Sequence, residues 1–155
     1  MDTSLNDLQK SKVQFFTEGR LLRLYEREYN EQHLSDIFGA FLPTEKKQWA
    51  TQMLSAQQTV QTRISMVGGE VHEAASRLMF GIIKGHKLAD GNKRSSILCM
   101  VGFYFINGYT TTFNPEDLYH KAKEVAALDS QTIDDEQEIS NLTAFLKDNT
   151  KPLTT

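Results

Sequence analysis

The sequence predicts an all-α fold with one short β-hairpin. Apolar residues recur at helical spacing over most of the chain, one segment alternates with a period of two, and turn residues separate the segments. With 155 residues, of which 39% are hydrophobic, the chain is long enough for one domain with its own core. We therefore treat residues 1–155 as a single domain.

Two helices are predicted in the first part of the chain. The first runs from about residue 18 to residue 38, and Gly39 ends it. Its four-residue repeat consists of Leu21, Tyr25 and Tyr29. The second helix occupies about residues 44–58. Residues 59–69 then follow a different pattern, because Val60, Thr62, Ile64 and Met66 alternate with polar residues before two glycines. This alternation predicts a short extended segment or hairpin.

Two further helices are predicted on either side of a polar loop. From Glu70 the helical period returns and continues to Gly85, a plausible C-terminal stop. One stripe of this helix carries Ala74, Leu78 and Ile82. A helix is predicted from about residue 92 to residue 106, and because apolar residues fill every face of its part from Ile97 to Ile106, it belongs in the middle of the fold. Cys99, the only cysteine, belongs to this segment and is expected in the core rather than as a reactive thiol.

The last third of the chain predicts a connector and two helices. Residues 109–113 form a short extended connector, and Asn114 followed by Pro115 is typical of a helix start. A final helix stops before Pro152. Its apolar residues are Ile139, Leu142, Phe145 and Leu146.

Composition excludes several classes of function. The net charge is −3, with 17 basic and 20 acidic residues spread along the chain, so we expect no direct nucleic-acid binding. No apolar run approaches the roughly 20 residues of a membrane-spanning helix. The N-terminus lacks the basic and apolar regions of a secretory signal. A cytoplasmic protein without membrane contact is expected.

The loop from His86 to Arg94 leads into a helix N-terminus and carries groups that bind phosphate. Unpaired backbone N–H groups and the helix dipole attract anions there, and Gly91 leaves the backbone open to a ligand. Lys93 and Arg94 add positive charge, and Arg94 can bind two phosphate oxygens at once. Each fragment alone is ordinary, because Asp90-Gly91-Asn92 is also a common turn or helix cap. The string as a whole predicts a phosphate site.

Two side chains of the same loop would add catalysis to phosphate binding. Asp90 offers a hard oxygen ligand suited to Mg²⁺ that bridges two phosphates. His86 titrates near neutral pH and can take a proton from an attacking hydroxyl. A base, a metal ligand and an anion site thus occur within nine residues.

The string from His86 to Arg94 resembles the signature of the Fic/Doc family, in which histidine, an apolar residue, an acid, glycine or alanine, asparagine and arginine occur in this order. The Doc (death-on-curing) branch is similar in particular, because its Asp-Gly/Ala-Asn-Lys-Arg string precedes small hydroxyl residues, as Ser95 and Ser96 do here. The likeness continues through Asn107-Gly108-Tyr109 and covers about residues 59–146.

The resemblance implies a Fic/Doc-type helical bundle with a β-hairpin flap that docks a target segment beside the active-site loop. Residues 59–69 lie where the flap is expected, although a surface hairpin without that role is the alternative. The expected docking residues are Arg63, Ile64, Ser65 and Met66. Carried over by position, His86 is the general base and Asp90 the Mg²⁺ ligand. Gly91 and Asn92 then form the anion cradle, with Lys93 and Arg94 as phosphate clamps.

Two positions depart from the family pattern. Leu88 replaces the phenylalanine that usually anchors the loop in the core, and a smaller anchor could loosen the loop. Ile97 stands where members that transfer AMP commonly carry a second arginine, and Lys93 replaces a glycine common among them. The site therefore looks like Doc, a kinase of a translation factor. We expect phosphoryl transfer from ATP, with Mg²⁺, to a target hydroxyl, and adenylyl transfer (AMPylation) is the alternative.

The resemblance also bears on partners and control. The target is expected to be a protein, with a translation factor as the candidate. An inhibitory helix of the kind found in relatives has only a broken match at Thr132–Glu136, because Gln137 interrupts the pattern. We therefore expect restraint by a separate antitoxin protein, as in toxin–antitoxin pairs, or no such restraint.

Two other classes of function remain open. A noncatalytic binding module of the same fold is one, since Leu88 departs from the family. A metal-dependent hydrolase is the other, with His86 and Asp90 joined by one of His33, His72 or His120. Those three histidines lack a convincing ligand spacing, and His72 and His120 are expected at the surface or as capping residues.

Overall fold

The fold consists of helices and one small sheet. The computed structural model describes residues 13–31, 45–85, 88, 91–129 and 131–153. In chain order the elements are α2 (Glu18–Glu31), α4 (Lys46–Val67), α5 (Val71–Gly85), α6 (Asn92–Ile106), β1 (Tyr109–Thr111), α7 (Pro115–Ala127), α8 (Asp135–Asp148) and β2 (Thr150–Pro152). Within the described part of the chain, no helix is both long and apolar enough to cross a membrane.

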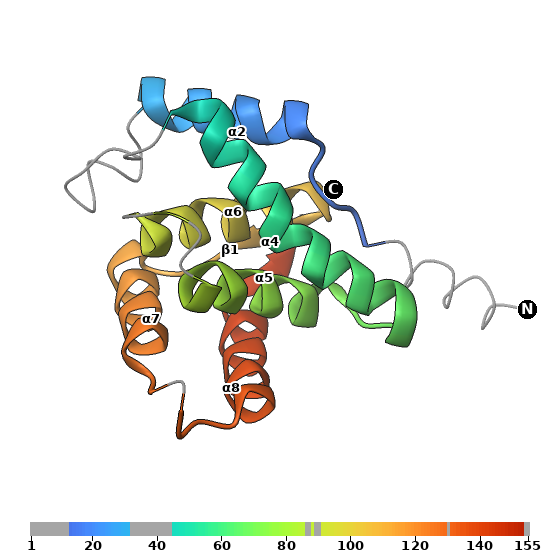
Figure 1. Cartoon of the computed structure of the whole chain (residues 1–155), viewed down its shortest axis with the longest axis vertical. Helices are drawn as coiled ribbons and strands as arrows, with labels where there is room; N and C mark the ends of the chain where they lie inside the picture. The colour runs from blue at the N-terminus through green and yellow to red at the C-terminus, as the bar shows by residue number, and fades with distance from the viewer. Residues whose placement is uncertain (1–12, 32–44, 86–87, 89–90, 130, 154–155) are drawn as a thin grey trace, which may run out of the picture.

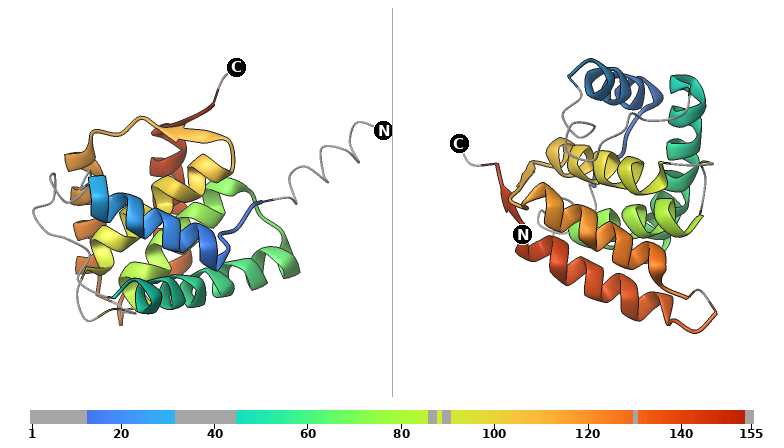
Figure 2. Two further views of the ribbon diagram at one scale, coloured as in Figure 1. Left: turned by 90° about the horizontal axis from the view of Figure 1, so that it is seen from above. Right: turned by 90° about the vertical axis from the view of Figure 1, so that its left-hand side faces the viewer.

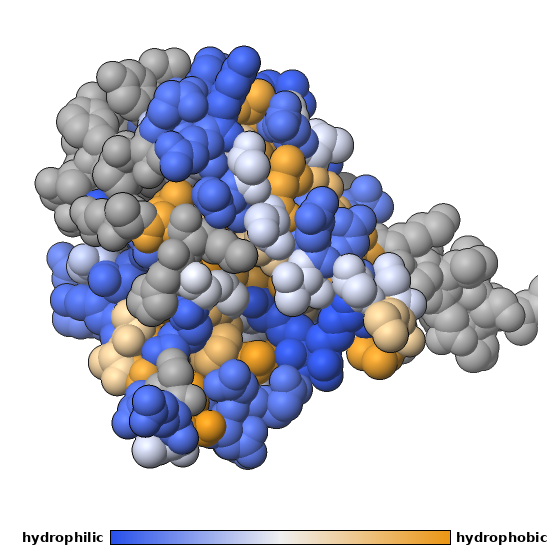
Figure 3. All heavy atoms as spheres, in the orientation of Figure 1, coloured by the Kyte–Doolittle hydropathy of each residue, from blue (hydrophilic) through white to orange (hydrophobic). Residues whose placement is uncertain are grey.

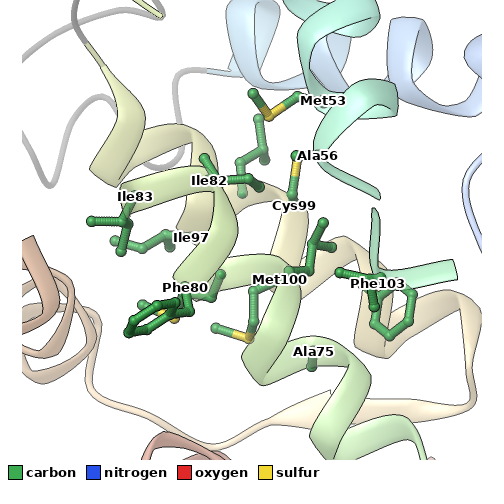
Figure 4. Close-up of a cluster of buried hydrophobic side chains, with 14 of the residues drawn as sticks. Met53, Ala56, Ala75, Phe80, Ile82, Ile83, Ile97, Cys99, Met100 and Phe103 are labelled. Carbon is green, nitrogen blue, oxygen red and sulfur yellow. The ribbon is translucent and has the colours of Figure 1, made fainter. Parts of the chain in front are cut away.

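Helices α5 and α6 form the centre of the fold. They run antiparallel, and α5 also contacts α4, α7 and α8 (Figure 1). Figure 4 shows side chains from α4, α5 and α6 meeting in one core, among them Met53, Ile82 and Met100. Buried residues lie on all sides of α6, which confirms the prediction of a central helix. Cys99 is buried within this core, as predicted.

Pairs of helices cover the two sides of this centre. Helices α2 and α4 lie on one side, and α7 and α8 lie on the other (Figure 2). The Tyr25 ring of α2 packs against the Trp49 ring of α4, with centroids 5.3 Å apart. The segment that precedes α2 is held by the amide side chain of Gln57. Gln57 exchanges hydrogen bonds of 2.7 and 2.9 Å with the backbone of Phe16.

The sheet joins two distant parts of the chain. β1 and β2 pair antiparallel, with Tyr109 opposite Pro152 and Thr111 opposite Thr150. β1 follows α6 directly, because Gly108 adopts a φ of 84° and turns the chain out of the helix. The sheet therefore ties the end of α8 to the end of α6.

The predicted hairpin at residues 59–69 is wrong, because α4 continues through this segment to Val67. The same alternation that suggested a strand contains a four-residue spacing, and Val60 and Ile64 continue the buried stripe of α4. Gly68, with a φ of 79°, donates its N–H to the Ile64 carbonyl and ends the helix. The all-α class with a small antiparallel sheet is confirmed, but the sheet is formed by β1 and β2.

Other element predictions are confirmed. Asn114 caps α7 by accepting the N–H of Glu116, and Pro115 is the first helical residue. Helix α8 ends at Asp148, before Pro152. The first predicted helix is observed from Glu18 to Glu31, and its expected continuation to residue 38 lies outside the described residues.

Candidate active site

The start of α6 has the geometry of an anion cradle. Gly91 is the N-cap residue and adopts a left-handed conformation with φ 83° and ψ 14°, which favours glycine. The first helical hydrogen bond runs from the N–H of Ser95 to the carbonyl of Gly91, over 2.9 Å. The N–H groups of Asn92, Lys93 and Arg94 precede this bond at the N-terminus of α6. Such groups, at the positive end of the helix dipole, suit a phosphate.

Asn92 fixes the loop that leads to this cradle. Its Oδ1 accepts the N–H of Leu88 at 3.1 Å, and its Nδ2 donates to the Leu88 carbonyl at 2.9 Å. The Leu88 side chain is 6% exposed and belongs to the core. Leu88 thus anchors the loop despite being smaller than the phenylalanine expected there. Because both polar groups of the Asn92 side chain are used in this way, Asn92 contributes to the cradle through its backbone N–H.

The two cationic residues lie on the first turn of α6. Lys93 and Arg94 are both partly buried, and the Nε atom of Arg94 is shielded from solvent. The hydroxyl of Ser96 donates to the Lys93 carbonyl over 2.7 Å. Positive charge and helical N–H groups are therefore brought together at one end of α6, as predicted from the sequence.

Two supporting residues were not predicted. Lys84, at the end of α5, donates to the carbonyls of Leu128 at 2.5 Å and Ala126 at 3.5 Å. This interaction satisfies the C-terminal carbonyls of α7 and holds α5 beside α7. Trp49 is fully buried and donates from Nε1 to the hydroxyl of Ser95 at 2.9 Å. No sequence signal pointed to this second contact, because Ser95 lies in a run of five polar residues at the start of α6.

The remaining predicted loop residues fall outside the described part of the chain. These residues are His86 and Asp90, the expected base and Mg²⁺ ligand. Their roles therefore remain predictions. Gly91, Asn92, Lys93 and Arg94 are adjacent at the cradle, and Leu88 is fixed to it.

The predicted docking residues Arg63, Ile64, Ser65 and Met66 do not form a flap beside the loop. They lie in the last turns of α4, next to the start of α5, whereas the loop begins at the other end of α5. A helix of 15 residues such as α5 is about 22 Å long. Met66 and Val67, which are 78% and 67% exposed, form a small apolar group at this distant corner (Figure 3). The hairpin form expected for these four residues is wrong, because they are helical, whereas target docking by them stays a prediction.

His72 was expected at the surface and is instead buried, with 7% exposure. Its Nδ1 lies 2.9 Å from the hydroxyl of Tyr104, and its ring also packs against Tyr109. Burial lowers the pKa of His72 below its ordinary value. His120 is exposed, as expected. In the ranges that the structure describes, no three His, Cys, Asp or Glu side chains gather as a metal site.

Glu136 is committed to a contact away from the cradle. Both of its carboxylate oxygens accept hydrogen bonds from Arg77, at 2.7 and 3.0 Å, and this pairing lowers the pKa of Glu136. Arg63 adds a second positive charge at 3.5 Å. The broken inhibitory pattern at Thr132–Glu136 thus supplies an ion pair between α8 and α5.

Comparison with known proteins places these features in a family. The family model described as Fic/DOC matches residues 15–104, which is more than half of the chain. The chain belongs to the Fic/DOC family. The match includes α2 and the first part of α4, which the resemblance in the sequence had not covered, and it ends within α6. No curated protein and no solved structure matches the chain significantly.

Membership gives the loop its context within the Fic/DOC fold. The family commonly transfers groups from nucleotides to proteins. In this chain the sequence that resembles the family signature, residues 86–94, stands between α5 and the first turn of α6. Helices α7 and α8 and both strands lie beyond the matched residues. Of these C-terminal elements, α7 contacts both α5 and α6, and Lys84 near the junction donates to the Leu128 carbonyl that follows α7.

Proposed function

We propose that this Fic/DOC protein transfers the γ-phosphoryl group of ATP to a hydroxyl on a target protein. The observation that carries the proposal is the first turn of α6. There, a left-handed glycine, the first N–H groups of the helix at the positive end of its dipole and two cationic side chains lie together. This combination suits a polyphosphate, because backbone dipoles and formal charges act on the same anion.

The chemistry assigns one role to each group of the loop. His86 takes the proton of the target hydroxyl, whose oxygen forms a bond to the γ-phosphorus. The bond from the γ-phosphorus to the bridging oxygen breaks, and ADP leaves with the electron pair. Lys93 and Arg94 stabilise the negative charge of the phosphates. The Asp90 carboxylate, together with phosphate oxygens, is a donor set suited to Mg²⁺, which would neutralise part of that charge.

Position 97 favours phosphoryl transfer over adenylyl transfer. Ile97 is fully buried and packs in the core between α5 and α6 (Figure 4). It therefore supplies no second cation of the kind common in AMP-transferring members. With fewer clamps on the outer phosphates, the γ-phosphate is held less rigidly as part of a leaving group, which supports a Doc-like reaction.

The proposed partners rest on the resemblance of the loop to that of Doc. We propose a protein target, with a translation factor as the candidate, and a separate antitoxin protein as the restraint. The pairing of Glu136 with Arg77 supports an external restraint, because it engages the one glutamate of the broken inhibitory pattern elsewhere.

Labelled ATP in a cell lysate tests the proposal. Wild type should transfer label from γ-labelled but not α-labelled ATP, and the modified target should gain the mass of one phosphate. His86→Ala should remove transfer but retain ATP binding, since the cradle does not use this side chain. Transfer of the α-label would indicate adenylyl transfer, and no transfer from either label would support a binding module.

A further inference from the structure

We propose that Trp49 is a positioning residue for the phosphate cradle and that it acts through Ser95. This inference rests on the proposed nucleotide site at the start of α6. Trp49 lies in the first turn of α4, and its indole N–H donates to the Ser95 hydroxyl at 2.9 Å. Both residues are fully buried. The bond thus joins the start of α4 to the start of α6, across 46 residues of sequence.

Ser95 is the residue that closes the first turn of α6. Its backbone N–H donates to the Gly91 carbonyl, and the three N–H groups of the cradle immediately precede it. A shift of Ser95 therefore moves Gly91 and changes the direction of these N–H groups. Since its hydroxyl is bound to Trp49, the position of the turn relative to α4 is fixed by a directional contact as well as by packing.

The identity of residue 95 fits this role better than a role in packing alone. Serine is unfavourable within helices and contributes little apolar surface, yet Ser95 is as deeply buried as the apolar residues that follow it on α6. A buried hydroxyl and a buried indole N–H each need a partner, and here they satisfy each other. An apolar residue at position 95 would leave the Trp49 N–H without this acceptor.

Trp49 is itself held in place on two sides. The Tyr25 ring packs against it at a tilt of 54°. Glu45 caps α4 by accepting the N–H groups of Lys47 at 2.9 Å and Gln48 at 3.2 Å. These backbone hydrogen bonds lower the pKa of Glu45. Trp49 can therefore serve as a fixed reference for α6.

The arrangement also gives the chain a built-in reporter. Trp49 is the only tryptophan, so intrinsic tryptophan emission arises from this one indole. Binding of a phosphate at the cradle would change the geometry of the hydrogen bond between Ser95 and Trp49. We expect MgATP to change the emission of Trp49 in the wild-type chain.

Two serine variants separate positioning from general stability. Ser76 is a matched control, because it is also fully buried and donates one 2.9 Å hydrogen bond, to the Ile139 carbonyl between α5 and α8. Ser95→Ala and Ser76→Ala should both lower the thermal midpoint. Only Ser95→Ala should raise the Kd for MgATP, roughly three- to tenfold by calorimetry, and reduce the emission change. Trp49→Phe should raise the Kd by a similar factor, and the double variant should be no weaker than either single variant.

The outcomes distinguish this inference from the proposed function. If wild type binds MgATP and both Ser95→Ala and Trp49→Phe retain its affinity, the Trp49–Ser95 contact serves stability alone and the inference is wrong. If Ser76→Ala weakens binding as much as Ser95→Ala, the effect is general and the inference is again wrong. Absence of MgATP binding by wild type overturns the proposed function itself. Should Ser95→Ala not fold, Trp49→Phe compared with Ser76→Ala decides the question.

Discussion

Removal of the Asn92 side chain should loosen the loop that leads to the cradle. Asn92→Ala eliminates two hydrogen bonds, to the N–H and carbonyl of Leu88. Each such bond contributes about 0.5–1.5 kcal/mol net, and the partial exposure of Asn92 favours the lower part of the summed range, about 1–2 kcal/mol. For a chain of 155 residues this corresponds to a fall of roughly 3–6 °C in the thermal midpoint.

The same loss should reappear in nucleotide binding. If ATP must order the loop that Asn92 no longer holds, the Kd should rise by about 5- to 30-fold, the factor equivalent to 1–2 kcal/mol. Calorimetry with MgATP measures the Kd, and thermal unfolding followed by circular dichroism measures the midpoint.

Asn107→Ala provides a matched control at the other end of α6. Asn107 makes the same paired contact with a backbone, accepting from the Gln14 N–H at 2.7 Å and donating to its carbonyl at 3.0 Å. This variant should lose comparable stability and keep wild-type affinity for MgATP. If both variants bind MgATP as wild type does, the reasoning that connects the Asn92 contact to the site is refuted.

Two further predictions concern the anchor and the buried histidine. Leu88→Ala should lower the free energy of unfolding by about 2–5 kcal/mol in urea titrations, because it removes a core side chain, and an unchanged midpoint would contradict its role as anchor. The lowered pKa of His72 means that the unfolded chain binds this proton more readily than the folded chain. The corresponding stability is complete above the ordinary pKa of 6.5 and is lost as pH falls below it, by at most about 1.4 kcal/mol per pH unit. Thermal midpoints from pH 7.5 to 5.5 should show this loss in wild type and in His120→Gln but not in His72→Gln, and equal curves for all three would count against it.

Local patterns predicted the helices whose burial is evident within one or two turns. Apolar residues fill every face of α6 from Ile97 to Ile106, so the central position of this helix followed from the sequence. The start of α7 was predicted equally well, because Asn114 and Pro115 act on the adjacent backbone. In both cases the decisive interactions join residues that are close in the chain.

The error at residues 59–69 came from judging a short window by itself. Val60 and Ile64 fit a period of two, but they also continue a stripe that begins with Trp49 and Met53. The longer stripe decides the structure, because α4 buries it continuously against the core. The true strands have three residues each and pair across about 40 positions, which no local pattern reveals.

Some features of the site depend on residues close in the chain and could be predicted, whereas others depend on distant contacts and could not. Gly91 and the first turn of α6 were predictable, since glycine conformation and helical N–H groups are local properties. The hydrogen bond from Trp49 to Ser95 was not, because it joins residues 46 positions apart. The cradle can thus be identified from the sequence, whereas the contacts that fix its direction depend on how α4 packs against α6.

The burial of Ile97 bears on why a second arginine is absent from this position. In the sequence, Ile97 was of interest because it stands where AMP-transferring members commonly carry a second arginine. In the fold its side chain is fully buried among core residues, so a charged group at this position would carry a large desolvation cost unless it found a partner. Reinstating the clamp would therefore require repacking of the core as well as a new charge. Among the described residues the cations at the cradle are Lys93 and Arg94, and the burial of α6 explains why position 97 does not add to them.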